Sequence, residues 1–197
     1  MIDRITDYLV KSQTIREEDK DIYSYGLKQG VTMLLQTVSV LLIGIVMGMW
    51  WQSVLFIFSY TPLRLSSGGI HAGKPWLCYI FTAVHAALVL LVIGNIMLSD
   101  LLLAIAIAVS TLVVWAIAPV EDKNKPFDEA ERKTYKKRTI IVLVVELVTM
   151  LVLMVLGLSE AAKCVCVTHG SFSVMVAAGA VSNKLRHKVK TASGEAK

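Results

Sequence analysis

Long apolar runs dominate this sequence and restrict the chain to the architectures that a lipid bilayer permits. Of its 197 residues, 55% are hydrophobic, and they gather in six segments: 30–49, 51–63, 76–98, 101–119, 139–158 and 161–182. All but one have about the ~20 residues that an α-helix needs to cross a membrane. The segment 51–63 is short and ends at Pro62, which indicates a partly re-entrant helix. The sequence therefore predicts an all-α polytopic membrane protein with about six transmembrane or partly re-entrant helices.

The N-terminal region has a different character from these apolar runs. Residues 1–28 carry mixed charges, with apolar side chains at helical spacing. This pattern is typical of an amphipathic helix on the membrane surface, although a soluble helix has the same spacing. The region lacks the basic start and apolar core of a signal peptide, so we expect no cleavable leader. We predict a surface-helix region at 1–28, a helical transmembrane domain at 29–183 and a basic cytoplasmic tail at 184–197.

Lysine and arginine are distributed unevenly among the connections. Of the 20 in the chain, the N-terminal region has five, the 64–75 connection two, the 120–138 loop seven and the tail five. The alternate connections have only Lys163. The positive-inside rule then predicts a multi-pass cell-membrane protein with both termini and the 64–75 connection in the cytoplasm. These cations suit anionic lipid headgroups, and no aromatic-rich basic motif indicates nucleic-acid binding.

The side chains best suited to chemistry lie between two of the apolar segments. The chain there reads Arg64-Leu-Ser-Ser-Gly-Gly-Ile-His71-Ala-Gly-Lys-Pro75-Trp-Leu-Cys78. Pro75 favours the first position of a helix, because its missing N–H would be unpaired there. Cys78 would then lie in the first turn, where the helix dipole favours a thiolate. A nearby imidazole can generate the thiolate and protonate a leaving amine, so His71 and Cys78 are candidate catalytic residues.

Other polar residues are candidates for supporting or substrate-binding roles. Arginine suits a carboxylate or carbonyl, hydroxyls suit an oxyanion, and glycines let the chain fold back. The candidates are Arg64, Ser66, Ser67, Gly68 and Gly69, with Glu146 as an intramembrane acid. Glu146 either pairs with a neighbouring helix or lines a substrate chamber.

Each candidate also has a plainer interpretation. A membrane cysteine is usually a small apolar residue, a loop histidine is usually solvated, and an arginine often anchors a helix end. We expect Cys164 and Cys166 to pack in the last span, and His85 to pack although it lies on the same helix face as Cys78. His169 belongs to no recognisable constellation. No His/Cys set has zinc-ligand spacing, so we expect neither a metal nor another cofactor.

Two motifs together resemble the accessory gene regulator protein B (AgrB) family. One is Arg64-x6-His71-x6-Cys78 with its glycine pair, and the other is Ala118-Pro119-Val-Glu-Asp-Lys-Asn-Lys-Pro126. The likeness also covers the chain length, the amphipathic N-terminus and the six apolar segments. It implies a membrane cysteine endopeptidase that cuts the C-terminal tail from an AgrD-type precursor peptide. The remainder is held as an acyl-enzyme and released as a cyclic thiolactone or lactone.

The resemblance also implies roles for individual residues. Cys78 matches the nucleophile and His71 the general base, while Arg64 and Gly69 match supporting positions. A homodimer is implied as well. An alternative from another class is a small membrane transporter or exporter of a peptide, with Arg64 and Glu146 along its path. The residues by themselves leave both alternatives open.

Overall fold

The computed structural model describes residues 2–68, 75–120 and 127–192, and within these ranges all regular elements are helices. They are α1 (Ile2–Lys11), the short 3-10 helix η1 (Glu17–Asp19), α2 (Lys20–Val46), α3 (Trp50–Ser67), α4 (Pro75–Asn95), α5 (Asp100–Ile117), α6 (Glu129–Val155) and α7 (Ser159–Ala192). Five of them, α2 and α4 to α7, are long and apolar enough to cross a membrane by length and composition. The predicted all-α polytopic membrane architecture is confirmed.

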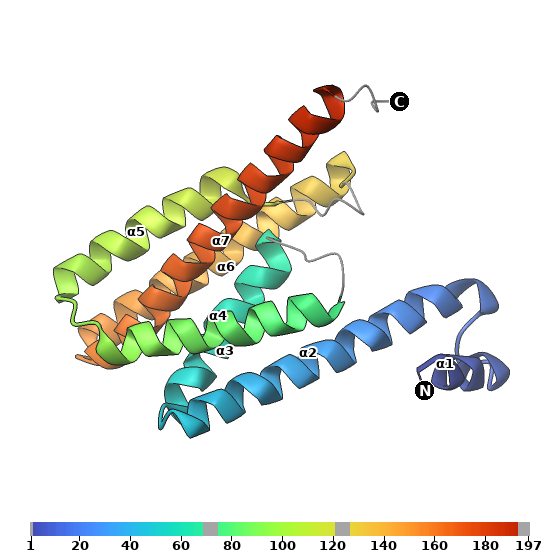
Figure 1. The fold of residues 1–197 in the computed structure, drawn as a ribbon, viewed down its shortest axis with the longest axis horizontal. Helices are drawn as coiled ribbons and strands as arrows, with labels where there is room; N and C mark the ends of the chain where they lie inside the picture. The colour runs from blue at the N-terminus through green and yellow to red at the C-terminus, as the bar shows by residue number, and fades with distance from the viewer. Residues whose placement is uncertain (1, 69–74, 121–126, 193–197) are drawn as a thin grey trace.

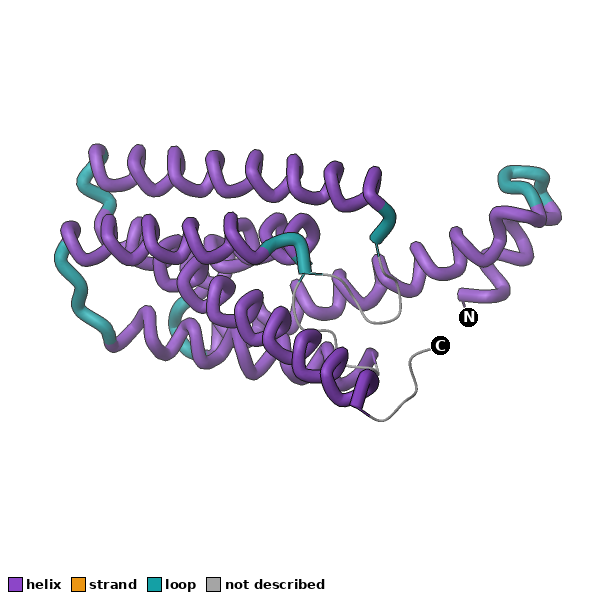
Figure 2. The backbone as a smooth tube through the Cα atoms, turned by 90° about the horizontal axis from the view of Figure 1, so that it is seen from above, coloured by secondary structure: helices purple, strands orange, loops and turns teal. Residues whose placement is uncertain are grey.

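Helices α2 to α7 run back and forth, so their connections alternate between two ends of the bundle (Figure 1, Figure 2). One end has the short connections 47–49, 96–99 and 156–158. The other end, which we call the motif end, has the last turn of α3, the first turn of α4, residues 118–120 and the start of α6. Both sequence motifs therefore lie at the same end of the molecule, although about 50 residues separate them in the chain.

Local sequence signals explain where several helices begin and end. A capping box opens α6: the Glu131 amide donates to Asp128 Oδ1 at 2.6 Å, and the Asp128 amide donates to Glu131 Oε2 at 3.4 Å. At the end of α2, the Met49 amide donates to the Gly44 carbonyl at 2.7 Å, which closes the helix in a Schellman motif. These signals are local and can be identified in the sequence.

Helix α3 lies at the centre of the bundle and packs against α2, α4, α6 and α7. The predicted end of this segment at Pro62 is wrong, because α3 continues to Ser67. Pro62 has no N–H for the helical ladder. The next turn is stabilised by the Ser66 hydroxyl, which donates to the carbonyls of Pro62 at 2.7 Å and Leu63 at 3.3 Å. With 18 residues, α3 is about 27 Å long at about 1.5 Å per residue.

The N-terminal region divides differently from the sequence-based proposal. Helix α1 packs against α2, and Lys20 Nζ lies 2.8 Å from Asp7 Oδ1. Residues 20–28 are the first turns of the continuous helix α2, whose N-terminal half extends beyond the bundle (Figure 1). The proposed boundary at residue 28 therefore falls inside α2, and the location of α1 on the membrane surface stays a prediction.

Candidate active site at the motif end of the bundle

The structure distributes the predicted site residues over two neighbouring helix ends. Arg64, Ser66 and Ser67 lie in the last turns of α3, followed by Gly68. Helix α4 begins at Pro75, as predicted, and Cys78 lies in its first turn. His71 and Gly69 fall outside the described residues, so their predicted roles stay predictions.

Gly68 joins the two sequence motifs. It lies directly against Val120, and the Val120 amide donates to the Ser67 carbonyl at 2.9 Å. Gly68 has φ +74° and ψ −141°, a conformation open essentially only to glycine. A Cβ atom at this position would lie 2.2 Å from the Val120 carbonyl oxygen. Glycine is therefore required here both for backbone conformation and for space.

The other polar groups around this junction act on backbone carbonyls. Arg64 Nη1 donates to the Gly68 carbonyl at 3.2 Å, which ties the end of α3 to the glycine that follows it. From α6, the Thr139 hydroxyl donates to the Ser66 carbonyl at 3.0 Å and accepts from Ser67 Oγ at 3.4 Å. Both serines are buried, with 5% and 0% of their surface exposed. Their hydroxyls therefore stabilise the end of α3 in this conformation, and the oxyanion role remains untested.

The predicted loop at 120–138 ends earlier in the structure, because α6 begins at Glu129, and one cation of this helix supports the second motif. Lys136 donates to the carbonyls of Trp115 and, at 2.9 Å, of Ala118, and its ammonium group lies 5.4 Å from the centre of the Trp115 ring. Positive charge at a helix C-terminus is stabilising, and α5 ends at Ile117. Lys136 thus holds the chain in place just before Pro119.

Cys78 differs from the other two cysteines of the chain. Cys164 and Cys166 are buried, at 0% and 2% exposure, and their thiols donate to the carbonyls of Gln52 and Leu103, each at 3.4 Å. Their predicted packing role is confirmed. Cys78 is half-buried at the motif end.

Tyr60 is a site residue that the sequence analysis missed. It is buried on α3, one turn before Arg64. Its ring lies 5.2 Å from the ring of His85, between centroids. No sequence pattern marks a tyrosine within an apolar segment as functional. Its spacing of four residues from Arg64 is the one local indication that both side chains lie on the same face of α3.

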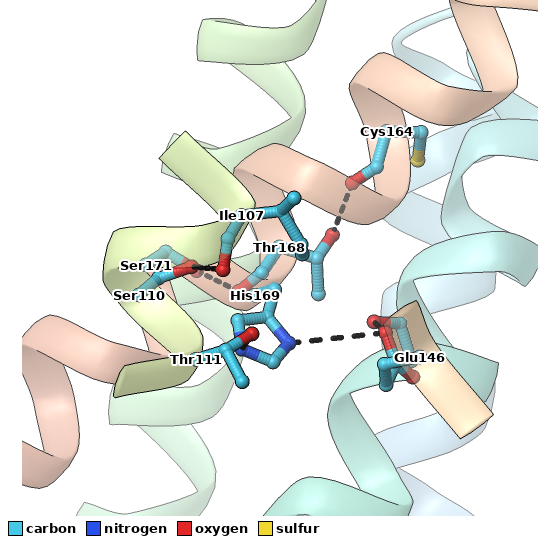
Figure 3. Close-up of polar contacts among 9 residues, drawn as sticks. Ile107, Ser110, Thr111, Glu146, Cys164, Thr168, His169 and Ser171 are labelled. Atoms are coloured by element: carbon cyan, nitrogen blue, oxygen red, sulfur yellow. Dashed lines mark hydrogen bonds and ion pairs between the residues drawn. The ribbon is translucent and has the colours of Figure 1, made fainter. Parts of the chain in front are cut away.

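Glu146 lies away from this junction, in the interior of the bundle (Figure 3). Its Oε2 accepts from Ser59 Oγ at 2.7 Å and lies 4.0 Å from His169 Nδ1. On the other side of the ring, His169 Nε2 lies 3.3 Å from Thr111 Oγ1. The predicted pairing of Glu146 with a neighbouring helix is confirmed, whereas the view of His169 as an isolated residue is wrong.

This interior cluster joins four helices, because Ser59, Thr111, Glu146 and His169 come from α3, α5, α6 and α7. Among the buried polar side chains of the described ranges, Glu146 is the one acid and His169 the one imidazole. A buried carboxyl group is costly unless it is hydrogen-bonded or paired. The cluster therefore selects one arrangement of these helices in an otherwise apolar interior.

The comparisons with known proteins agree with this geometry. The family model "Accessory gene regulator B" matches residues 2–177. AgrB-like protein 2 of Clostridium perfringens strain 13 is 28% identical over 138 residues, covering 66% of this chain and 64% of that protein. An AgrB-like protein of C. perfringens strain SM101 is 25% identical with the same coverage.

A third relative, an AgrB-like protein of Listeria monocytogenes serotype 4a, is 25% identical over 142 residues, covering 71% of this chain and 70% of its own. The chain thus spans about two thirds of the length of these relatives. No solved structure matches it significantly. Because the family model covers nearly the whole chain, this protein belongs to the accessory gene regulator B family.

Proposed function

We propose that this chain is a membrane cysteine endopeptidase that removes the C-terminal tail of an AgrD-type quorum-sensing precursor peptide and permits its cyclisation. The placement of Cys78 carries the proposal. It is the one cysteine of the three that is not buried, and it lies in the first turn of α4 at the end where both family motifs meet. Membership of the family supports a role in peptide processing.

The chain on either side of His71 is anchored. Gly68 is held by Arg64 and Val120, and helix α4 starts at Pro75. Residues 69–74 separate these two ends in the sequence, so His71 is close in the chain to both of them. This arrangement supports His71 as the base that acts on Cys78.

The proposed reaction has two transfers. The Cys78 thiol gives its proton to His71 and the sulfur attacks the scissile carbonyl carbon; the C–N bond breaks and His71 protonates the leaving amine. The peptide is then a thioester on Cys78. An internal thiol or hydroxyl of the peptide attacks that carbonyl, its proton returns to Cys78, and the C–S bond to the enzyme breaks. A site at the membrane edge limits the water that would hydrolyse the thioester.

The test is cleavage of an AgrD-type precursor peptide co-expressed with the chain. We expect Cys78→Ala and His71→Ala to abolish cleavage, and Cys78→Ser to give no thioester adduct. Cys164→Ala and Cys166→Ala serve as controls and should retain most of the cleavage, because both thiols are buried among helices. Cleavage by a correctly inserted Cys78→Ala chain would refute the mechanism and favour the transporter alternative.

We also propose that the motif end and both termini face the cytoplasm, where the precursor is made. The distribution of Lys and Arg supports this orientation. A membrane-impermeant thiol reagent added to intact cells should label a Gly157→Cys chain but not a Lys184→Cys chain. The reverse pattern would place the site on the outer side. Crosslinking of two differently tagged copies tests the homodimer that the family resemblance implies.

A further inference from the structure

A groove between α4 and α7 begins one helical turn beyond Cys78. Its volume is about 520 Å³, within the range of about 300–1,000 Å³ that is usual for ligand pockets. Helix α4 contributes Phe81, His85, Leu88, Val89 and Val92, and the wall from α7 includes Gly170, Val174 and Met175. His85 is the one ionisable side chain in this apolar lining.

The groove is aligned with the proposed nucleophile. Cys78, Phe81, His85, Leu88 and Val92 are separated alternately by three and four residues, so they form one stripe along α4. Tyr60 on α3 packs against this groove: its ring centroid lies 5.2 Å from that of His85, and its hydroxyl donates to Met175 Sδ at 3.6 Å.

His85 has no hydrogen-bond partner for either ring nitrogen among the described residues, and both nitrogens are buried. The ring is surrounded by aromatic side chains, with centroid distances of 5.2 Å to Tyr60, 6.0 Å to Phe56 and 6.5 Å to Phe81. A buried polar atom without a partner costs about 1–3 kcal/mol. His85 lines the groove while both of its nitrogens are buried, so a half-turn about the Cβ–Cγ bond, which exchanges the nitrogens with ring carbons in the same space, would be needed to bring a nitrogen to the groove.

We propose that this groove binds the apolar residues of the precursor on the amino side of the scissile bond, and that His85 hydrogen-bonds to their backbone. The proposal rests on the proposed function, because that part of the peptide stays attached to Cys78 after cleavage. From Phe81 to Val92 the groove is about 16 Å long at about 1.5 Å per residue, which accommodates about five extended residues.

The unpartnered nitrogens favour a peptide over a lipid acyl chain as the occupant. A peptide backbone offers both carbonyl acceptors and N–H donors, whereas an acyl chain offers neither. In this proposal, the apolar walls of the groove determine which side chains of the peptide fit, and His85 aligns the peptide backbone. Holding the acyl peptide beside the thioester also favours ring closure over loss of the peptide to water.

Binding is measured with the Cys78→Ala chain in lipid nanodiscs and a fluorescently labelled AgrD-type precursor peptide. Adding His85→Phe keeps the aromatic packing and removes both nitrogens, so we expect the affinity to fall about tenfold. His85→Asn restores a donor and an acceptor and should recover part of this loss. Unchanged affinity in the His85→Phe chain would overturn the role of His85.

Two glycines give a matched test of the groove itself. A Cβ atom would meet nothing within 4 Å at Gly170, which lines the groove, or at Gly30 on α2. Gly170→Leu fills the groove and should weaken binding by about tenfold or more, whereas Gly30→Leu should leave it within about twofold. Equal losses of affinity in the two variants would refute the location of the peptide-binding site in this groove.

Photocrosslinking distinguishes a bound peptide from a bound lipid, and its positive result does not depend on impairing the protein. Photoreactive benzoylphenylalanine in place of Val174, which is 69% exposed, should capture the precursor in cells that express the Cys78→Ala chain. Capture of lipid alone would refute peptide binding. Because these measurements use a chain without the nucleophile, they are separate from the test of the mechanism: cleavage by this chain would refute the peptidase mechanism but leave the binding result intact.

Discussion

Two polar clusters include residues of α3, and their hydrogen-bonding groups find partners of different kinds. In the middle of the helix, Ser59 donates to Glu146 and Glu146 approaches His169, so side chains from separate helices pair with one another. At the motif end, Arg64 and Thr139 donate mainly to backbone carbonyls. The interior cluster determines which helices are neighbours. The end cluster shapes the backbone that leads to the proposed catalytic residues.

This difference predicts a division between activity and stability. A change at the motif end should impair cleavage more than thermal stability, because the backbone there positions reacting groups. A change in the interior cluster should lower stability first, because it leaves buried polar groups without partners. The following substitutions test the division, beginning with the largest expected effect.

Gly68→Ala should have the largest effect on cleavage, a loss of about hundredfold or more. The added Cβ would meet the Val120 carbonyl at 2.2 Å and would also be strained at φ +74°, so the two motifs must separate. Initial rates of precursor cleavage measure it. Gly157→Ala is the matched control: it has φ +70° but nothing within 4 Å, and it lies at the opposite end of the bundle. An equal loss in both variants would mean that backbone strain alone, not the junction, matters.

Glu146→Ala should lower stability by about 1–3 kcal/mol, since it leaves the buried Ser59 hydroxyl without its acceptor and removes the carboxylate that lies 4.0 Å from His169 Nδ1. Thermal unfolding in nanodiscs measures the change. Glu146→Gln keeps an acceptor for Ser59 and should lose much less. Glu160→Ala removes an exposed carboxylate from its pair with Lys163, which keeps its hydrogen bond to the Ile96 carbonyl, and should change stability by at most about 1 kcal/mol. A greater effect on cleavage than on unfolding would assign Glu146 to the site instead.

Thr139→Val should cost about 1–2 kcal/mol and reduce cleavage about tenfold, because the Ser66 carbonyl and Ser67 hydroxyl both lose their partner on α6. Thr134→Val is a close control: both hydroxyls donate to the carbonyl four residues earlier on α6, at 2.9 Å for Thr139 and 2.8 Å for Thr134. Only Thr139 also reaches α3. If the two variants behave alike, the contact between α6 and the end of α3 is unimportant.

Lys136→Met should have the smallest effect, a loss of about 0.5–1 kcal/mol with a modest decrease in cleavage. It removes the cation that binds the Trp115 and Ala118 carbonyls at the end of α5. The exposed neighbour Lys137 provides the control, because Lys137→Met removes the same charge from the loop without this contact. Equal losses would indicate that the loop acts through its net charge, for example on an acidic peptide tail.

Much of the fold is predictable because the signals are local. Apolar segments of spanning length identify the helices, and Pro75 correctly marks the start of α4. The apolar stretch at 51–63 identifies α3 but not its full length, since the last turn contains polar residues that are buried against protein. Its extension past Pro62 depends on the Ser66 hydroxyl and on contacts from distant parts of the chain, which no local pattern reports.

The sequence by itself determined that the chain is a bundle of membrane helices, that its cations gather at one side, and that Cys78 opens a helix. Tertiary structure decided which groups meet: Gly68 with Val120, Glu146 with Ser59 and His169, and Tyr60 with His85. The physical reason is that hydropathy specifies the length of a membrane helix but not its rotation about its own axis. In a uniformly apolar solvent, rotation is set by interhelical packing and by a few buried hydrogen bonds.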